Sequence, residues 1–407
     1  MYEHYHAPRL TRRTLFSALI PGAILAPHAF PQSAASMAER FRQMSAALER
    51  EGLAEPFKGI TTNGSVESGL FGIHSTGIST APVRMAAERF LASLTQQQRD
   101  RTLFAIDDPE WRKWMNQHFY ARQGVSFKEM TEAQRGLAFG LLQESLSARG
   151  MRLTRDIMRL NETLAELTGD HDFLGEWLYF ITVMGKPSAN EPWGFQLDGH
   201  HAIINYFVLG DQVVMTPFFA GSEPVTAPSG KYKGVTILQD EQNRGLDMLL
   251  ALDNGQRAKA ILNPNKTENY NLTEAFKDNV VLDYAGARAA DFPEAQRKHL
   301  LDLVELYVGN MDDGHAHVKM DDVARYIERT RFAWIGGSDS AAVYYYRIHS
   351  PVILIEFDHQ RPANLSRFAK DPKVPTRQHI HCVVRTPNGN DYGKDLLRQH
   401  YQSHAHA

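Results

Sequence analysis

Cysteine is almost absent from the sequence, which carries only Cys382. A single thiol cannot form an intramolecular disulfide, so the fold depends on the burial of apolar side chains in any redox compartment. Its isolation also excludes zinc ribbons and iron–sulfur clusters, because those sites require several sulfur ligands. We therefore expect any metal ion in this protein to be bound by nitrogen and oxygen atoms.

The chain also lacks a strong charge of either sign. It has 44 Lys and Arg against 47 Asp and Glu, which gives a net charge of -3 over 407 residues. This balance produces no long-range field that attracts polyanions, so we do not expect nucleic acid as a partner. The hydrophobic content of 43% is typical of a folded chain with one large core or two packed subdomains.

Several catalytic and membrane signatures are missing as well. The sequence has no Gly-rich phosphate loop, no Gly-x-Ser-x-Gly elbow and no His-Glu-x-x-His helix, which argues against nucleotide binding and common serine-hydrolase chemistry. Beyond the amino terminus, no stretch reaches the roughly 20 apolar residues that a membrane-spanning helix needs. We expect a small-molecule substrate and no membrane span in the mature chain, while the oligomeric state stays open.

The amino terminus has the pattern of a targeting segment. Arg12 and Arg13 precede an apolar run that continues through Leu25, and small residues that suit signal cleavage follow. This pattern predicts a twin-arginine-type signal over residues 1–35 and a periplasmic or secreted location. Export in the folded state usually accompanies loading of a cofactor in the cytoplasm, which fits a metal site.

The first part of the mature chain has helical spacing of its apolar residues. This spacing extends over residues 36–170 and predicts a helical subdomain. Capping boxes at Thr95–Gln98 and Thr131–Gln134 mark two helix starts, and Gly150 is expected to end the second helix.

The second part, residues 171–402, contains short β-branched or aromatic runs separated by helical segments. The expected strands cover 177–184, 193–197, 202–209, 212–219, 344–348, 352–357 and 379–385, and the expected helices cover 241–262, 293–308, 320–329 and 394–401. This order predicts an α+β fold, in which the helical subdomain packs on a mixed or antiparallel β-rich subdomain with inserted helices. A disordered tail is expected at residues 403–407.

The most specific chemical signal is the pair His379 and His381 in an apolar run. On a strand, residues two apart project to the same side, so both imidazoles can bind one metal ion. A surface or core role for the pair is the alternative. The sequence contains 18 histidines, and a metal site requires a third partner for this pair.

Glu356 is a candidate for that partner, because it lies in a hydrophobic strand. A buried carboxylate must pair with a cation, bind a metal or become protonated. We expect Glu356 to complete the metal shell or to act as the general base. A salt bridge to Arg347 or Arg385 is the alternative.

A second histidine pair follows Asp198 and Gly199 in the segment 193–201. If the residues after Gly199 are extended, His200 and His201 point to opposite faces, and only one of them shares a face with Asp198. We expect one histidine to be a metal ligand and the other to be structural, with Asp198 near the reaction centre. A core or hydrogen-bonding role is the alternative for each of them.

Other polar residues receive supporting roles. Arg385 or Arg347 is expected to receive an anionic group of the substrate. Asp391, after a Pro-Asn-Gly turn, is expected either to orient a ligating imidazole or to cap a helix. His315 and His317 are expected in a solvated acidic loop.

Several separate motifs resemble the DUF3500 family. They are Ala133–Leu137, Trp193–His201, Thr216–Gly221, Trp334–Gly337, Ile355–Phe357 and His379–Gly393. The resemblance covers most of the mature chain and implies a shared fold and a shared set of polar residues. It implies no reaction, because the function of the family is unknown.

Together these residues favour an exported metal-dependent enzyme. His379 and His381, with one of His200 and His201, are expected to bind a divalent ion, zinc in the first place and copper or iron as alternatives. Hydrolysis of a small anionic or polar substrate is the expected reaction, because a bound metal lowers the pKa of its water. Glu356, Asp198 and Arg385 are the expected catalytic residues.

Three alternatives stay open. The first is a metal-dependent oxidoreductase, and the second is an exported protein that binds a small ligand or a metal without turnover. The third is a metal-free acid/base site made by the same histidines and carboxylates. A catalytic metal site should leave one coordination position open, whereas a sequestering site should be closed by protein ligands.

Overall fold

The computed structural model describes residues 34–403 of the chain. The signal predicted at residues 1–35 lies outside the described residues except for its last two positions, and the tail predicted at 403–407 does so except for Ser403. From Arg40 onward the described chain forms one compact unit. The division of this unit into two subdomains stays a prediction.

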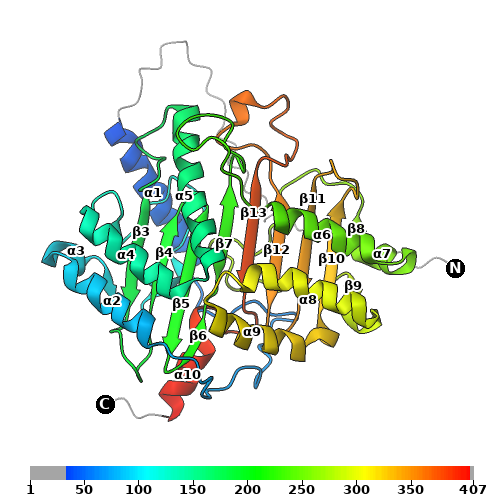
Figure 1. Ribbon diagram of the computed structural model, residues 1–407, viewed down its shortest axis with the longest axis horizontal. Helices are drawn as coiled ribbons and strands as arrows, with labels where there is room; N and C mark the ends of the chain where they lie inside the picture. The colour runs from blue at the N-terminus through cyan, green and yellow to red at the C-terminus, as the bar shows by residue number, and fades with distance from the viewer. Residues whose placement is uncertain (1–33, 404–407) are drawn as a thin grey trace. The chain divides into compact units, whose positions relative to one another are not determined.

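A single mixed sheet forms the centre of this unit (Figure 1). Its strands are β1 (Leu103–Phe104), β2 (Val125–Ser126), β3 (Tyr179–Met184), β4 (Trp193–Gly199), β5 (Ala202–Leu209), β6 (Gln212–Val214), β7 (Phe218–Ser222), β8 (Ile261–Asn263), β9 (Ala287–Arg288), β10 (Arg331–Gly336), β11 (Tyr344–His349), β12 (Leu354–His359) and β13 (Ile380–Arg385). The main path runs β1-β3-β4-β5-β7-β13-β12-β11-β10-β8, and β2, β6 and β9 pair with β3, β5 and β10. All these pairs are antiparallel except β1 with β3 and β8 with β10. The fold is therefore α+β, as predicted.

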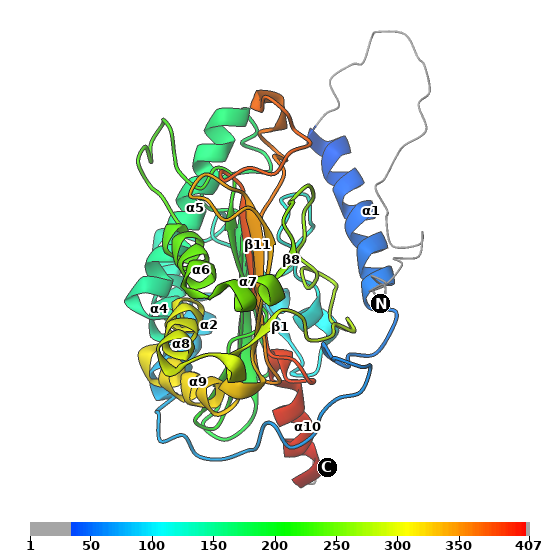
Figure 2. The same cartoon turned by 90° about the vertical axis from the view of Figure 1, so that its right-hand side faces the viewer.

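The helices alternate with groups of strands along the sequence. They are α1 (Ala34–Gly52), α2 (Ala81–Ser93), α3 (Gln96–Asp100), α4 (Glu132–Ser145), α5 (Ala148–Thr168), α6 (Gln239–Ala251), α7 (Asn254–Ala260), α8 (Glu294–Val308), α9 (Asp313–Arg325) and α10 (Lys394–Ser403). Helices α2, α4, α5, α6, α8 and α9 lie on the same side of the sheet (Figure 2). Their apolar residues and one face of the strands form the largest hydrophobic cluster.

The opposite face of the sheet is covered mainly by loop segments and by α10. A second hydrophobic cluster lies here and includes Trp111, Trp114, Phe219, Val383 and Leu396. Residues two apart on a strand share a face, so His381 lies on the same loop-covered face as Val383. Loops carried by a rigid scaffold are the usual location of functional residues.

The local helix signals are only partly confirmed. Both capping boxes form, with Thr95 and Thr131 accepting hydrogen bonds from the backbone N–H groups of Gln98 and Gln134. Gly150 does not end a helix, because it lies in the first turn of α5. A Cβ at Gly150 would come within 2.0 Å of the Asn310 carbonyl oxygen, so this glycine allows two segments to approach closely.

Two expected elements are each split in two. The strand expected at 212–219 is divided into β6 and β7, since Pro217 between them has no N–H for the ladder. The helix expected at 241–262 is divided into α6 and α7, because Asp253 starts a new capping box. Strands β1, β2, β8, β9 and β10 were not among the expected strands, and β8 begins at Ile261, where the expected helix was still continuing.

The histidines expected in an acidic loop lie instead on α9, which begins at Asp313. Asp312 caps this helix, and its carboxylate accepts a hydrogen bond from His315 Nδ1 at 2.9 Å. His315 is consequently buried, whereas His317 is exposed on the same helix. Within residues 34–403, no helix combines the length and apolar character required to cross a membrane.

Candidate metal centre

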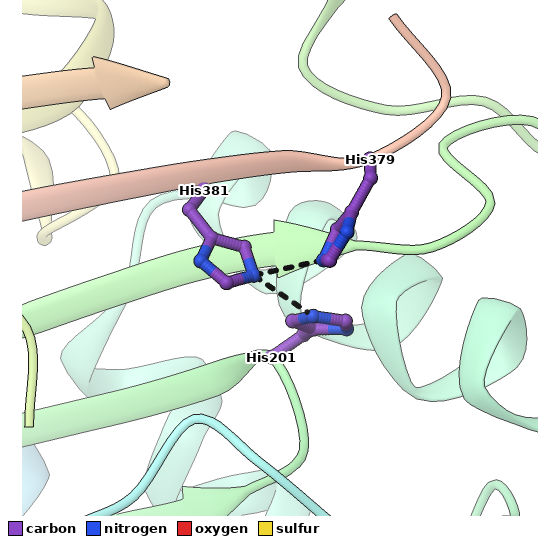
Figure 3. A group of neighbouring side chains, drawn as sticks. All are labelled: His201, His379 and His381. Atoms are coloured by element: carbon purple, nitrogen blue, oxygen red, sulfur yellow. Dashed lines mark hydrogen bonds between the residues drawn. The ribbon is translucent and has the colours of Figure 1, made fainter. Parts of the chain in front are cut away.

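Three imidazoles converge where the β4–β5 turn meets the start of β13 (Figure 3). His201 Nε2 lies 3.2 Å from His381 Nε2, and His379 Nε2 lies 3.0 Å from the same atom. The three side chains are buried, and their potential ligand atoms all lie within 4.8 Å of one another. The structure thus gathers residues that are 180 positions apart in the sequence.

The β4–β5 turn consists of His200 and His201 alone. His201 adopts a left-handed φ of 66°, which is uncommon for a residue with a side chain. Two backbone hydrogen bonds hold this conformation, one from its N–H to the Asn116 carbonyl and one to its carbonyl from the N–H of Gly221. The turn therefore directs the His201 ring into the cluster (Figure 3).

His200 lies outside the cluster, in contact with its neighbour. The two rings are not on opposite faces, as an extended segment would require, but stack with centroids 3.9 Å apart. His200 Nδ1 lies 2.8 Å from the side-chain oxygen of Asn161 on α5. Burial and nearby imidazoles hold the pKa of His200 well below its usual range, so the ring is neutral. Of the His200 and His201 pair, only His201 is part of the cluster.

The β13 histidines project to the same side, as their spacing predicts. Gly221 on β7 lies directly opposite His381 in the sheet. A Cβ at Gly221 would lie 3.1 Å from the His381 ring and 2.7 Å from the Ile380 carbonyl oxygen. Glycine at this position therefore leaves the space that the His381 imidazole occupies.

Hydrogen bonds fix which ring nitrogen of two histidines carries the proton. His379 Nδ1 donates to the Arg361 carbonyl at 2.7 Å, and His381 Nδ1 donates to Glu274 Oε1 at 2.6 Å. In a neutral imidazole the other nitrogen then has a free lone pair. Both Nε2 lone pairs are therefore directed at one point, and they would repel each other unless a cation or a proton lies between them.

The environment of the cluster favours the neutral form of these rings. Burial lowers the pKa of His201 and His381 well below the usual histidine range, and neighbouring imidazoles lower both pKa values further. Neutral imidazole is the form that binds metal ions. His201 and His381 are thus in the neutral form that binds a metal ion.

Two of the three nitrogen–nitrogen separations are close to those around a tetrahedral ion. With Zn–N bonds of about 2.0–2.1 Å, tetrahedral geometry places two ligand nitrogens roughly 3.3 Å apart. The separations of 3.0 and 3.2 Å are close to that value. Three nitrogen ligands leave a fourth position for a water molecule or substrate, as in catalytic zinc sites. The cluster can hold a metal ion.

Glu274 is a site residue that the sequence did not indicate. Its carboxylate orients His381 in the way that carboxylates orient metal-binding imidazoles. Burial raises the pKa of Glu274 to about 7, although the nearby His379 and Asn116 oppose this shift. Glu274 lies in a loop without strand or helix periodicity, so no pattern in the sequence linked it to His381.

Glu356 does not reach the cluster, because other groups bind its carboxylate. It accepts hydrogen bonds from the N–H of Leu272, from the N–H and hydroxyl of Thr273, and from the Tyr345 hydroxyl. Burial raises the pKa of Glu356, and these hydrogen bonds oppose the shift. The residue that follows Thr273 is Glu274, so Glu356 anchors the segment that contacts His381.

Arg385 also holds that segment and lies outside the cluster. Its guanidinium donates to the Thr273 carbonyl at 2.9 Å, to Asp391 at 2.7 Å and to Asp278 at 2.6 Å. Asp391 also accepts from the N–H of Thr386, so its carboxylate orients no imidazole. Arg385 and Asp391 are both fully buried, and their charges compensate each other.

Asp198 is likewise paired away from the cluster. Its carboxylate accepts a hydrogen bond from Arg122 Nε at 2.9 Å. Burial raises the pKa of Asp198 to about 6, and Arg122 opposes this shift. Neither residue has a hydrogen bond with the three imidazoles, and no pattern in the sequence linked Arg122 to Asp198 across 76 positions.

The adjacent Gly199 has a packing role. A Cβ there would lie 2.1 Å from the Tyr179 ring, so the glycine makes room for this aromatic side chain. The Tyr179 hydroxyl donates to the His200 carbonyl at 2.8 Å. Tyr179 therefore supports the turn that presents His201.

Fold and site together define an α+β protein with a buried tri-histidine cluster on the loop-covered face of a mixed sheet. The chain belongs to the DUF3500 family of proteins of unknown function, whose family model matches residues 76–394. The three cluster histidines and Glu274 lie within this range. No curated protein and no solved structure matches the chain.

Proposed function

We propose that the protein is a metal-dependent hydrolase with His201, His379 and His381 as the metal ligands and zinc as the ion. One observation carries the proposal: three buried Nε2 atoms converge while the Nδ1 protons of two rings are bound by oxygen acceptors. A structural zinc site uses four protein ligands. In the described part of the chain only three His, Cys, Asp or Glu side chains converge here, which supports a catalytic site.

A bound zinc ion would act as a Lewis acid and lower the pKa of a water molecule toward neutrality. The residues of the chain supply the geometry for this chemistry. The Arg361 carbonyl and Glu274 fix the orientation and tautomer of two ligands, and the turn residue His200 supports His201 by stacking. Histidine ligands also bind copper and iron, which carry out redox reactions. The identity of the bound ion therefore distinguishes the proposed hydrolase from the oxidoreductase alternative.

We propose a small polar or anionic substrate, for which the balanced charge and the burial of the cluster are the support. Of the two arginines expected to bind its anionic group, Arg385 is engaged elsewhere, because each of its guanidinium nitrogens donates to a group of the chain. Arg347 makes one hydrogen bond, from Nη2 to the Asp283 carbonyl at 3.4 Å, and its buried Nε has no partner. Of the two, Arg347 is therefore the arginine that keeps a donor for a ligand.

Export through the twin-arginine pathway is part of the same proposal. Its support is the Arg12-Arg13 pair before an apolar run and small residues. Replacement of both arginines by lysine should leave the protein in the cytoplasm, as measured by cell fractionation and immunoblotting. Normal export of this variant would contradict the proposal.

The ligand set is tested by elemental analysis of protein purified from its native compartment. We expect one zinc ion per chain, and loss of the ion when His379 and His381 are both replaced by alanine. His317→Ala is the matched control, because His317 is exposed on α9 and lies apart from the cluster. Full metal content in the double variant would refute the ligand assignment.

Turnover is tested separately on ester, amide and phosphoester substrates. We expect hydrolysis that stops when the ion is removed by a chelator and returns when zinc is added. Stoichiometric zinc without turnover on any substrate would support the binding-protein alternative. Copper or iron in the site would support the oxidoreductase alternative.

A further inference from the structure

A cavity lies at the other end of β13 from the histidine cluster. Its volume is about 300 Å³, and Thr386 lines it directly after the strand ends. Thr386 is five residues beyond His381, which corresponds to roughly 16 Å along an extended strand. Its wall includes residues of β6 and α9, two elements that lie at the lower end of the view in Figure 1, whereas the segment before β13 is at the upper end.

Most of the cavity wall is apolar. The wall includes Phe71, Val214, Phe218, Val308, Met311 and Val384. These side chains come from the segment before α2, from β6, β7 and β13, and from α8 and its C-terminal end. Pockets of this kind bind the apolar part of a ligand and use a few polar groups to orient it.

One lysine supplies a cationic group in this wall. Lys319 on α9 lines the cavity, and its Nζ donates to the Val352 carbonyl at 2.8 Å. An ammonium group has three donors, so two remain for a ligand. Asp322, one turn further along α9, forms its ion pair with Arg325 at 3.0 Å and not with Lys319.

The positive charge of Lys319 is therefore only weakly compensated. Burial lowers the pKa of Lys319, while the more distant Asp322 and Asp391 oppose this shift. Of the other ionisable side chains in the wall, His315 is held by Asp312 and by the Asp211 carbonyl, and Arg325 pairs with Asp322. The neighbours of the Lys319 ammonium are the Val352 carbonyl and the Phe71 ring, whose centroid is 5.9 Å from Nζ, and neither is an anion. A positive charge without a close anionic partner in an apolar setting is costly, and a ligand carboxylate would relieve that cost.

We propose that this cavity binds a small amphipathic carboxylate, which pairs with Lys319 through its carboxylate and places its apolar chain against the cavity wall. The volume limits the ligand to a small molecule, because ligand pockets range from about 300 to 1,000 Å³. The site is separate from the proposed metal centre. The two sites share no residue, although the strands β7 and β13 run between them.

The test is a calorimetric titration of the full chain with hexanoate and with hexan-1-ol, its neutral counterpart. Both titrations are made with a chelator present, because a carboxylate also binds zinc. We expect hexanoate to bind at least tenfold more tightly than hexan-1-ol. The variant in which His379 and His381 are replaced by alanine should bind hexanoate as the unmodified chain does. A loss of hexanoate binding in this variant would assign the ligand to the histidine cluster and overturn the proposal.

Two variants test the contacts inside the cavity. Lys319→Met keeps the length of the side chain and should weaken hexanoate binding at least tenfold, with hexan-1-ol binding unchanged. Val318→Phe places a larger side chain in the wall and should abolish binding of both compounds. The control Lys298→Met removes an exposed lysine on α8 and should change neither.

The proposal fails if the unmodified chain does not bind hexanoate. It also fails if hexan-1-ol binds as tightly as hexanoate. Unchanged hexanoate binding in either Lys319→Met or Val318→Phe would refute it as well. Because the two variants alter different parts of the wall, a folding defect in one leaves the other as a test.

Discussion

Glu274→Ala tests whether the cluster is organised as a metal centre. The carboxylate accepts a hydrogen bond from His381 Nδ1 at 2.6 Å, which fixes the tautomer that leaves Nε2 free. Loss of such an outer partner typically lowers metal affinity 10- to 100-fold, or about 1.4–2.7 kcal/mol. We expect a loss of this size for Glu274→Ala and a smaller one for Glu274→Gln, which keeps an oxygen acceptor without the charge.

Zinc affinity is measured by competition with a chromophoric chelator at pH 7.5. Glu268→Ala is the matched control, because Glu268 belongs to the same loop and is exposed. Circular dichroism and the unfolding midpoint show whether each variant is folded. If folded Glu274→Ala binds zinc within twofold of the unmodified chain, the carboxylate does not orient a ligand and the reasoning is refuted.

Three further substitutions probe the supports of the site and one buried acid. Gly221→Ala should lower zinc affinity at least tenfold in the same competition assay, because its Cβ would lie 3.1 Å from the His381 ring; unchanged affinity would show that the strand adjusts at no cost. Glu356→Gln turns an amide toward the donors of Leu272 and Thr273, and should reduce both zinc affinity and the free energy of unfolding, the latter by roughly 2 kcal/mol in urea titrations. Burial raises the pKa of Glu110 from 4.5 to about 8, so this carboxyl group binds a proton more tightly in the folded state than in the unfolded state. The free energy of unfolding should therefore fall by about 1.4 kcal/mol per pH unit as the pH rises from 5 to 8. Urea titrations of Glu110→Gln should lack this part of the slope, and an identical slope would refute the assignment.

Features encoded by neighbouring residues were predictable from the sequence. The capping boxes at Thr95 and Thr131 are local patterns, and both form. The orientation of His379 and His381 follows from the two-residue repeat of a strand. The α+β class follows from the order of helical and strand-like segments. This order stays the same when the boundary of a single segment is predicted wrongly.

Features that depend on distant contacts were not predictable. The choice of His201 over His200 depends on the left-handed turn conformation and its hydrogen bond with Gly221 on another strand. Glu274 reaches His381 across 107 positions from a loop without periodicity. The start of α9 at Asp313 was missed, and with it the position of His315 in the wall of the cavity.

Two of the buried charges that the sequence singled out, Glu356 and Arg385, share one role in the structure. The Glu356 carboxylate accepts hydrogen bonds from the N–H and the hydroxyl of Thr273. Arg385 donates a hydrogen bond to the carbonyl of Thr273, so the backbone of Thr273 is held on both sides. The next residue, Glu274, is thereby fixed against His381. A buried carboxylate and a buried guanidinium are costly unless they are fully hydrogen-bonded, and here both are bonded to the loop that they position. Their burial is therefore accounted for by the hydrogen bonds that hold the loop carrying Glu274 next to His381.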